Sequence, residues 1–283
     1  MDPSHRSNGS NTRPVIQATP RGGGRSRAAG RVDRVLNTAL AGERAAVLNV
    51  SAAEMLADPE AVAGVIQAAV DRPGVGVMGH WMIHELFRRS ELHDELLNSL
   101  ASPDPGLRKA AARICGAARL PESALWISDL VEDPDPHVRE VAVRSLARLG
   151  GRRAVEQLMA ADQKDGQIPL HRLAISLARA ASDIDIEALM RQPGSERVAV
   201  AAVLACGLRR DVLRVSPLLG IAHDRRWPKQ VRLAACKALA TIGDRSAADG
   251  LNRLTESDPE PDIKKAAARA HRRLLKRALP RPR

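Results

Sequence analysis

The sequence predicts an all-α fold: a right-handed α-solenoid of about six helical hairpins with an N-terminal helical cap. Nearly the same segment occurs at 102–116 and again at 132–150, and segments with the same apolar spacing return along the chain. In each of them the apolar residues follow the i, i+3, i+4, i+7, i+8 spacing of one helix face. The chain has three Trp, one Phe and no Tyr. Its core must therefore be built from Ala, Leu, Val and Ile, which suit helices that pack closely.

Composition excludes several classes of protein. No run of about 18 consecutive apolar residues is present, which argues against a membrane span. The N-terminus also lacks the apolar segment of a secretory signal. The three cysteines, Cys115, Cys206 and Cys236, are an odd number without CxxC spacing. This pattern argues against a disulfide framework and a cysteine-based zinc site. We expect a cytoplasmic protein without cofactor or metal.

The positive charge lies at the two ends of the chain. Residues 1–31 contain six Arg and one acidic residue, and residues 264–283 contain nine Lys or Arg and no acidic residue. Residues 1–31 are also rich in Ser, Asn, Gly and Pro, so we expect a disordered basic tail there. This tail is either solubilising, a binding segment or a targeting segment. A second basic tail is expected at 277–283.

Residues 32–94 are predicted to form a helical cap or a degenerate first repeat. Helices are expected at 62–70 and 82–90, on either side of the glycine-rich segment 71–79. A solenoid needs such a terminal unit because its outer face must tolerate water.

Residues 95–276 are predicted to form the solenoid itself. The second helix of each hairpin carries the apolar spacing, and its first apolar residue advances by 28 to 33 residues from one hairpin to the next. These starting residues are Leu107, Val138, Leu170, Val198, Val231 and Ile263. First helices are expected before them, for example at 95–100, 123–131, 154–160, 186–190 and 247–254.

Helix ends are also marked in the sequence. Asp104, Asp135 and Glu260 each stand before a proline. An acidic N-cap followed by proline at the first helical position favours a helix start. Gly150 and Gly243 are expected to end second helices, because glycine tolerates the left-handed conformation found there.

These residues resemble a known family. The segments "DPDPHVREVAVRSLARLG" and "KQVRLAACKALATIGDRSAADGL" are similar to HEAT repeats, most closely to the short bacterial subtype named after phycobilisome lyases. The resemblance covers about 95–276 and implies HEAT-like hairpins. It also implies a structural ladder of Asp and Arg side chains between neighbouring repeats. The candidates for this ladder are Asp104 with Arg108, Asp135 with Arg139, and Arg232.

The resemblance further implies that the exposed side of the second helices lines a concave binding face. This side has an apolar centre flanked by basic positions, which suits a partner protein helix with an apolar face and acidic edges. The alternative is that these residues only pack between repeats. The predicted groove consists of Arg113, Arg144, Arg172, Ile175, Val200, Val203, Leu204, Leu233, Lys237 and Arg269. The sequence thus favours a non-catalytic protein-binding scaffold.

Two alternatives remain open from the sequence. Nucleic acid could bind the basic termini through charge alone, with contacts expected from Arg272, Arg273, Lys276 and Arg277. The name of the subtype suggests a bilin-lyase-like enzyme, although no catalytic set marks a pocket for it.

Smaller features give further expectations. His84–Glu85 is similar to the His-Glu pairs of a HEAT-like di-iron hydroxylase, but that family needs several such pairs and this chain has one. Cys115 and Cys206 fall on the inward phase of their helices. Cys236 falls on the exposed phase, which makes it the candidate thiol for modification.

Overall fold

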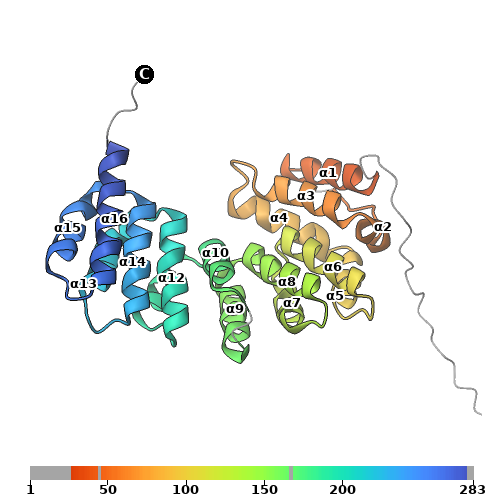
Figure 1. Ribbon diagram of the computed structural model, residues 1–283. Coiled ribbons are helices and arrows are strands. Elements are labelled where there is room, and N and C mark those ends of the chain that lie inside the picture. Colours follow the sequence, from red (N-terminus) through yellow and green to blue (C-terminus); the bar gives the residue numbers. More distant parts are fainter. Residues whose placement is uncertain (1–26, 44–45, 166–167, 279–283) are drawn as a thin grey trace, which may run out of the picture.

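The computed structural model describes residues 27–43, 46–165 and 168–278 (Figure 1). In these residues the regular secondary structure consists of sixteen α-helices and four short 3-10 helices. The predicted all-α class is therefore confirmed, and the helices follow one another across the molecule as a solenoid (Figure 1).

The six predicted hairpins are all present. Their first helices are α5 (Leu92–Leu100), α7 (Ala124–Asp129), α9 (Gly151–Asp165), α11 (Asp183–Arg191), α13 (Val215–His223) and α15 (Ala248–Ser257). Their second helices are α6 (Pro105–Ala118), α8 (Pro136–Leu149), α10 (Leu170–Ala180), α12 (Glu196–Arg209), α14 (Lys229–Ile242) and α16 (Pro261–Ala278). The 3-10 helices η1 (Pro121–Ser123), η2 (Leu130–Glu132), η3 (Val212–Arg214) and η4 (Arg245–Ala247) lie beside first helices.

The N-terminal part extends this array. It contains α1 (Arg27–Leu40), α2 (Ala52–Ala57), α3 (Pro59–Val70) and α4 (Gly76–Arg88). Helix α3 packs on α6 as a further second helix would, α2 contacts α5, and α1 packs on α3. The pair α2–α3 is thus a degenerate repeat, and α4 is an additional helix that contacts α1, α3 and α5.

Two predicted boundaries need correction. Helix α1 begins at Arg27, so residues 27–31 are helical rather than part of a tail. Its residues Val32, Leu36 and Ala39 are buried at helical spacing, a pattern that the surrounding Arg and Gly conceal. At the other end, α16 continues to Ala278, two residues beyond the predicted end of the solenoid. The remaining tail residues, 1–26 and 279–283, lie outside the described part of the chain.

The predicted helix caps are largely confirmed. The Asp104 carboxylate accepts a hydrogen bond of 2.7 Å from the backbone N–H of Gly106, and Asp135 does the same for α8. Gly243 ends α14 with a φ of 79°. Glu260 differs from the prediction, because its side chain accepts a hydrogen bond from Arg232 instead.

The second helices approach one another very closely. A methyl group added to Gly116 of α6 would lie 2.6 Å from the Cβ of Ser145 in α8. A methyl group added to Gly207 of α12 would lie 2.9 Å from the Cα of Ala238 in α14. Because no side chain could occupy these positions without displacing a helix, glycine sets the spacing between repeats.

The predicted arginine ladder joins neighbouring repeats at Arg108 and Arg232, but with different acceptors, whereas Arg139 donates to the backbone carbonyls of Asp133 and Pro134 in its own repeat. Arg108 of α6 forms two hydrogen bonds, of 2.7 and 2.9 Å, with the carboxylate of Asp133 in the next repeat. Arg232 of α14 is buried and donates one hydrogen bond to Asp258, which lies before α16 in the next repeat. The predicted acceptors Asp104 and Asp135 cap their own helices, whereas the actual acceptors of the ladder lie two residues before a cap position.

The ladder is interrupted in the middle of the solenoid. The position of Arg108 and Arg232 is occupied by His171 in α10 and by Ala199 in α12. Arg197 instead reaches back to Asp162 of α9, with a distance of 2.9 Å from its Nε to the carboxylate. The third hairpin is therefore held to its neighbours by different contacts from those at the two ends of the array.

We predict that Gly207→Ala lowers the free energy of unfolding by about 1–3 kcal/mol, because the added methyl group forces α12 away from α14. The matched control is Gly220→Ala in α13, where nothing lies within 4 Å of the added methyl group. That change should raise stability by about 0.5–1 kcal/mol, since alanine favours helix. Urea denaturation followed by circular dichroism measures both, and effects of the same sign would contradict this account of the spacing.

Candidate functional site

Helix α10 departs from the pattern of the other second helices. It has 11 residues, whereas α6, α8, α12 and α14 have 14 each. Its Ile175 is 45% exposed. The matching residues Val143 of α8, Val203 of α12 and Cys236 of α14 are buried. Neighbouring repeats cover this position in the other second helices, but they leave it exposed on α10.

The open side of α10 carries one apolar and two basic residues. Arg172, Ile175 and Arg179 are spaced i, i+3 and i+7, which places them on one helix face; we call these three residues the α10 strip. At 1.5 Å rise per residue, its two arginines are separated by about 10 Å along the helix axis. The strip thus presents an exposed apolar side chain between two positive charges.

One pocket lies where α8 and α10 begin. This N-terminal pocket has a volume of about 240 Å³ and is lined by Val131, Pro136, Arg139, Glu140, Val143, Ile168, Pro169 and Arg172. Glu140 accepts a hydrogen bond of 2.7 Å from Arg172, and this bond holds the pKa of the Glu140 carboxyl below its usual range. Arg144 lies 3.9 Å from the same carboxylate. The positive charge at this end is thus shared with an acidic residue.

A second pocket lies where α8 and α10 end. This C-terminal pocket has a volume of about 500 Å³. Its walls come from the ends of α3, α6, α8 and α10 and from the turns that lead into α9 and α11. They consist of Gln67, Asp71, Arg119, Ala147, Arg148, Leu149, Gly150, Gly151, Arg179, Ala180, Ala181 and Ser182.

The C-terminal pocket has an excess of positive charge. Three of its lining residues are arginines and one, Asp71, is a carboxylate. Asp71 lies 3.6 Å from Arg119 and accepts a hydrogen bond from Gln67. Burial and the nearby charges of Arg179 and Arg144 lower the pKa of the Arg148 guanidinium. Positive charge is thus concentrated here beyond what the wall itself neutralises.

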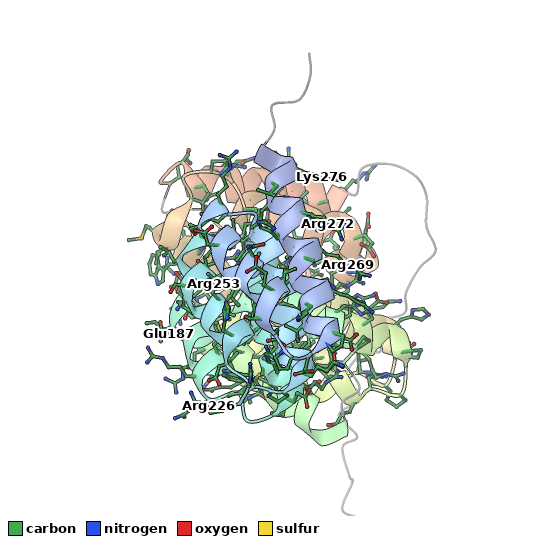
Figure 2. The ribbon with its side chains drawn as sticks, turned by 60° about the vertical axis from the view of Figure 1, so that its left-hand side comes forward. Glu187, Arg226, Arg253, Arg269, Arg272 and Lys276 are labelled. Atoms are coloured by element: carbon green, nitrogen blue, oxygen red, sulfur yellow. The ribbon has the colours of Figure 1, made fainter. Side chains whose placement is uncertain are left out.

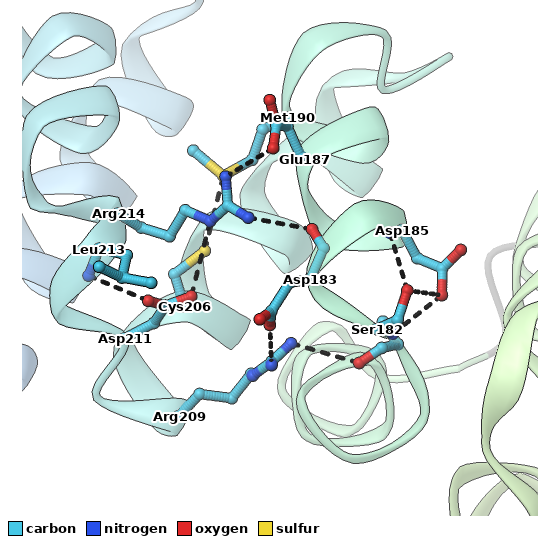
Figure 3. Close-up of polar contacts among 11 residues, drawn as sticks. Ser182, Asp183, Asp185, Glu187, Met190, Cys206, Arg209, Asp211, Leu213 and Arg214 are labelled. Carbon is cyan, nitrogen blue, oxygen red and sulfur yellow. Dashed lines mark hydrogen bonds and ion pairs between the residues drawn. The ribbon is translucent and has the colours of Figure 1, made fainter.

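The wall that Ala181 and Ser182 contribute is fixed by a polar network (Figure 3). Arg209 of α12 donates a hydrogen bond of 3.2 Å to the carbonyl of Ala181 and also pairs with Asp183. The Ser182 side chain caps α11 reciprocally with Asp185. The arginines of this network have acidic partners, which distinguishes them from Arg148 and Arg179 in the pocket.

The structure separates the predicted groove residues into four groups, the last of which, Val200 and Val203, is buried. Arg144, Ile175, Lys237 and Arg269 are exposed. Arg113 and Arg172 are engaged in ion pairs, with Glu60 and Glu140 respectively. Leu204 and Leu233 are partly buried and pack against the core.

The predicted apolar centre is wrong for two residues. Val200 and Val203 are 8% and 1% exposed, because the repeats pack against each other at this phase of α12. Arg144 and Arg172 are brought together at Glu140, and Ile175 lies one turn beyond Arg172 on α10, whereas Lys237 and Arg269 lie on α14 and α16. The sequence prediction did not include Arg119, Arg148 and Arg179. Arg148 and Arg179 stand in the last turns of their helices, where a basic residue is common for electrostatic reasons.

The basic residues of the last helix are exposed. Arg269, Arg272 and Lys276 lie along one side of α16 (Figure 2), and Arg273 is exposed beside them. Arg277 lies in the last turn of α16, and its side chain is outside the described part of the structure.

The histidines that the sequence offered as metal ligands lie beside a carboxylate. The His84 Nε2 lies 3.1 Å from a carboxylate oxygen of Glu122, and the His93 Nε2 lies 3.8 Å from the other. No group of three or more His, Cys, Asp or Glu side chains in the described part of the chain is arranged to hold a metal ion. Likewise, none of the described helices is long and apolar enough to cross a membrane.

Helical hairpins stacked through small residues, with an open basic strip on one second helix, define a repeat protein of the α-solenoid class. A model of the HEAT repeats family matches residues 93–178 and 185–272. The chain therefore belongs to the HEAT-repeat family, as its sequence predicted. No curated protein matches the chain in sequence.

Two solved structures illustrate what the chain is similar to. Human deoxyhypusine hydroxylase in complex with glycerol is 17% identical, with 88% of this chain and 97% of that chain covered and a TM-score of 0.34. The complex of CpcE and CpcF of phycocyanin lyase from Nostoc sp. is 20% identical, with 77% and 88% covered and a TM-score of 0.32. At these scores neither carries an argument about activity.

The cysteines generate a prediction that corrects the sequence analysis. Cys236 is buried rather than exposed, and burial raises the pKa of its thiol to about 11. Burial also raises the pKa of Cys115 to about 12 and that of Cys206 to about 11. Since the thiolate is the reactive form, none of the three should react with a disulfide reagent at pH 8 in the native state. All three should react in denaturant, and a fast native phase in the absorbance assay would contradict this placement.

Proposed function

We propose that the chain is a non-catalytic scaffold that binds a protein partner on the face formed by its second helices, centred on α10. The observation that carries the proposal is the α10 strip, where Ile175 is exposed between Arg172 and Arg179. Isolated exposed apolar residues are common on protein surfaces. This one, however, stands where the equivalent residues of α8, α12 and α14 are buried, and each end of the strip reaches a pocket.

The charges around the strip indicate the chemistry of the partner. An apolar side chain that packs on Ile175 would lose contact with water, and acidic groups on either side would meet Arg172 and Arg179. On a partner helix, acidic residues seven positions apart are separated by about 10 Å, the same as the arginines of the strip. We therefore expect a helical segment with an apolar residue between two acidic ones.

The test compares two isoleucine variants in a pull-down from the native host's lysate. Ile175→Asp should reduce recovery of the partner about tenfold or more, because it places a charge at the apolar contact and faces acidic residues. The matched control is Ile184→Asp on α11, where the isoleucine is 81% exposed and lies outside both pockets. Ile184→Asp should recover the same partner as the unmodified protein, at the same moderate salt concentration.

Folding must be measured alongside binding. Because Ile175 is exposed, Ile175→Asp should change the free energy of unfolding by less than about 0.5 kcal/mol. Val203→Asp buries a charge between repeats and should cost about 3 kcal/mol or more. Equal recovery of the same proteins by the Ile175→Asp and Ile184→Asp variants would refute the proposed docking site.

A second function is favoured by one observation on α16. Its exposed residues Arg269, Arg272, Arg273 and Lys276 are spaced i, i+3, i+4 and i+7 and form a basic stripe on the last helix (Figure 2). Among the described residues, no ion pair with a carboxylate involves these four side chains. Such a stripe can contact nucleic acid phosphates through charge, without reading sequence.

Charge reversal tests this second function. Arg269→Glu, Arg272→Glu and Arg273→Glu together should abolish binding to a labelled duplex DNA. The same number of reversals at Arg225, Arg226 and Arg253, which are also exposed, should weaken it much less. The logarithm of the unmodified protein's affinity should fall with the logarithm of salt concentration, with a slope of about −0.9 per phosphate contact. Equal loss in both triple variants would mean that net charge, rather than α16, is responsible.

A further inference from the structure

The C-terminal pocket contains basic groups that the surrounding protein leaves without partners. Arg148 and Arg179 form no hydrogen bond or ion pair with the described residues. The Nε of Arg119 is buried and has no hydrogen-bond acceptor in the described part of the structure. A buried N–H group without an acceptor is uncommon in proteins and calls for an explanation.

The helix ends around the pocket do not supply the missing negative charge. Helices α8 and α10 end here, and their C-termini carry partial negative charge. The turns after them lead directly into α9, through Gly150 and Gly151, and into α11, through Ser182. The partial positive charges of these two N-termini lie at the same pocket and offset those of the two C-termini.

The remaining helix ends neutralise part of the arginine charge. Helices α3 and α6 also end at the pocket, and together they contribute about one negative charge. Asp71 contributes one more and is tied to Arg119. Three guanidinium groups therefore still exceed the negative charge of the walls, and the one carboxylate among the lining residues, Asp71, is already engaged with Arg119 and Gln67.

The turn before α9 adds backbone donors of a suitable kind. Gly150 and Gly151 have φ values of 65° and 76°, in the region that favours glycine. Gly150 precedes and Gly151 begins a helix of 15 residues, whose first N–H groups have no partner within the helix. A glycine turn that leads into a helix N-terminus is a known setting for phosphate groups.

We infer that the C-terminal pocket binds a phosphomonoester through Arg119, Arg148 and Arg179. A phosphomonoester carries nearly two negative charges and three acceptor oxygens, and guanidinium groups bind phosphate oxygens with two parallel hydrogen bonds each. A carboxylate offers only two acceptor oxygens, fewer than a phosphomonoester offers to the N–H donors of three guanidinium groups. The pocket volume of about 500 Å³ leaves room for the group that carries the phosphate.

This inference does not depend on the proposed docking site, because the phosphate need not belong to a docked partner. It can belong to a free small molecule or to a phosphorylated side chain of a partner. In either case the same three arginines would hold it. The test therefore uses both forms of phosphate and reads binding directly, rather than through capture of a partner.

Calorimetry should measure the binding of free phosphoserine and of a short phosphoserine peptide that contains no other acidic residue. Both titrations use the full-length protein at constant ionic strength. Arg148→Met and Arg179→Met should each reduce the affinity about tenfold or more, since each removes charge-assisted hydrogen bonds. The matched control is Arg253→Met, an exposed arginine on α15, which should leave the affinity unchanged.

The comparison of the two probes assigns the source. Equal affinities indicate a site for a small phosphomonoester, and an affinity at least tenfold higher for the peptide indicates a phosphorylated partner. If neither probe binds, or if the Arg148→Met and Arg179→Met variants bind as tightly as Arg253→Met, the inference is overturned.

A thermal melt without ligand separates binding from a purely structural role. If Arg148 serves only to stabilise the end of α8, Arg148→Met should lower the melting temperature. If it is held for a ligand, its removal relieves repulsion between partly buried charges, and the melting temperature should stay the same or rise. A lowered melting temperature together with unchanged affinity for phosphoserine would exclude the binding role.

Discussion

The close approach of the second helices is the constraint on which the rest of the structure depends. With Phe87 as its one fully buried aromatic residue among those described, the core is built mainly from small and medium aliphatic residues, and such a core is dense only if the helices nearly touch. Gly116 and Gly207 make this possible, because any side chain there would meet the next helix. The regular spacing of the hairpins, and with it the position of every exposed residue, follows from these contacts.

The candidate site exists because one helix does not satisfy that constraint. Helix α10 has Ile175 and Arg179 at the two positions where α12 has Val203 and Gly207. An arginine cannot occupy the close contact that Gly207 makes, so the packing opens around α10. The two pockets and the exposed strip are consequences of this local change rather than of a separate structural element.

Sequence reasoning was strongest where one physical rule acts alone. Helical spacing, acidic caps before proline and glycine at helix ends predicted the hairpins almost to the residue, for example Asp104 and Asp135 at the starts of α6 and α8. It was weaker for α1, whose apolar face lies among arginine and glycine. A helical wheel shows which phase points away from the core, but not how closely the next helix approaches.

The same limit explains the errors in the candidate site. Val203 and Cys236 lie on the phase expected to be exposed and are covered by neighbouring repeats, whereas Ile175 at the equivalent position is not. The arginines of the C-terminal pocket come from α6, α8 and α10, and Asp71 comes from α3. Their convergence depends on the curvature of the whole array, which no single repeat encodes.

The interruption of the arginine ladder has a consequence for how the repeat array unfolds. In a repeat array each unit is stabilised by its own folding and by its contact with the next unit. Arg108–Asp133 and Arg232–Asp258 couple units at the two ends, but α10 and α12 carry His171 and Ala199 at the equivalent position. At the third hairpin the coupling depends instead on Arg172–Glu140 and Arg197–Asp162, whose arginines are more exposed than Arg108 and Arg232, so we expect the two halves of the array to separate here first. The residues that bear the candidate site stand at the junction between them.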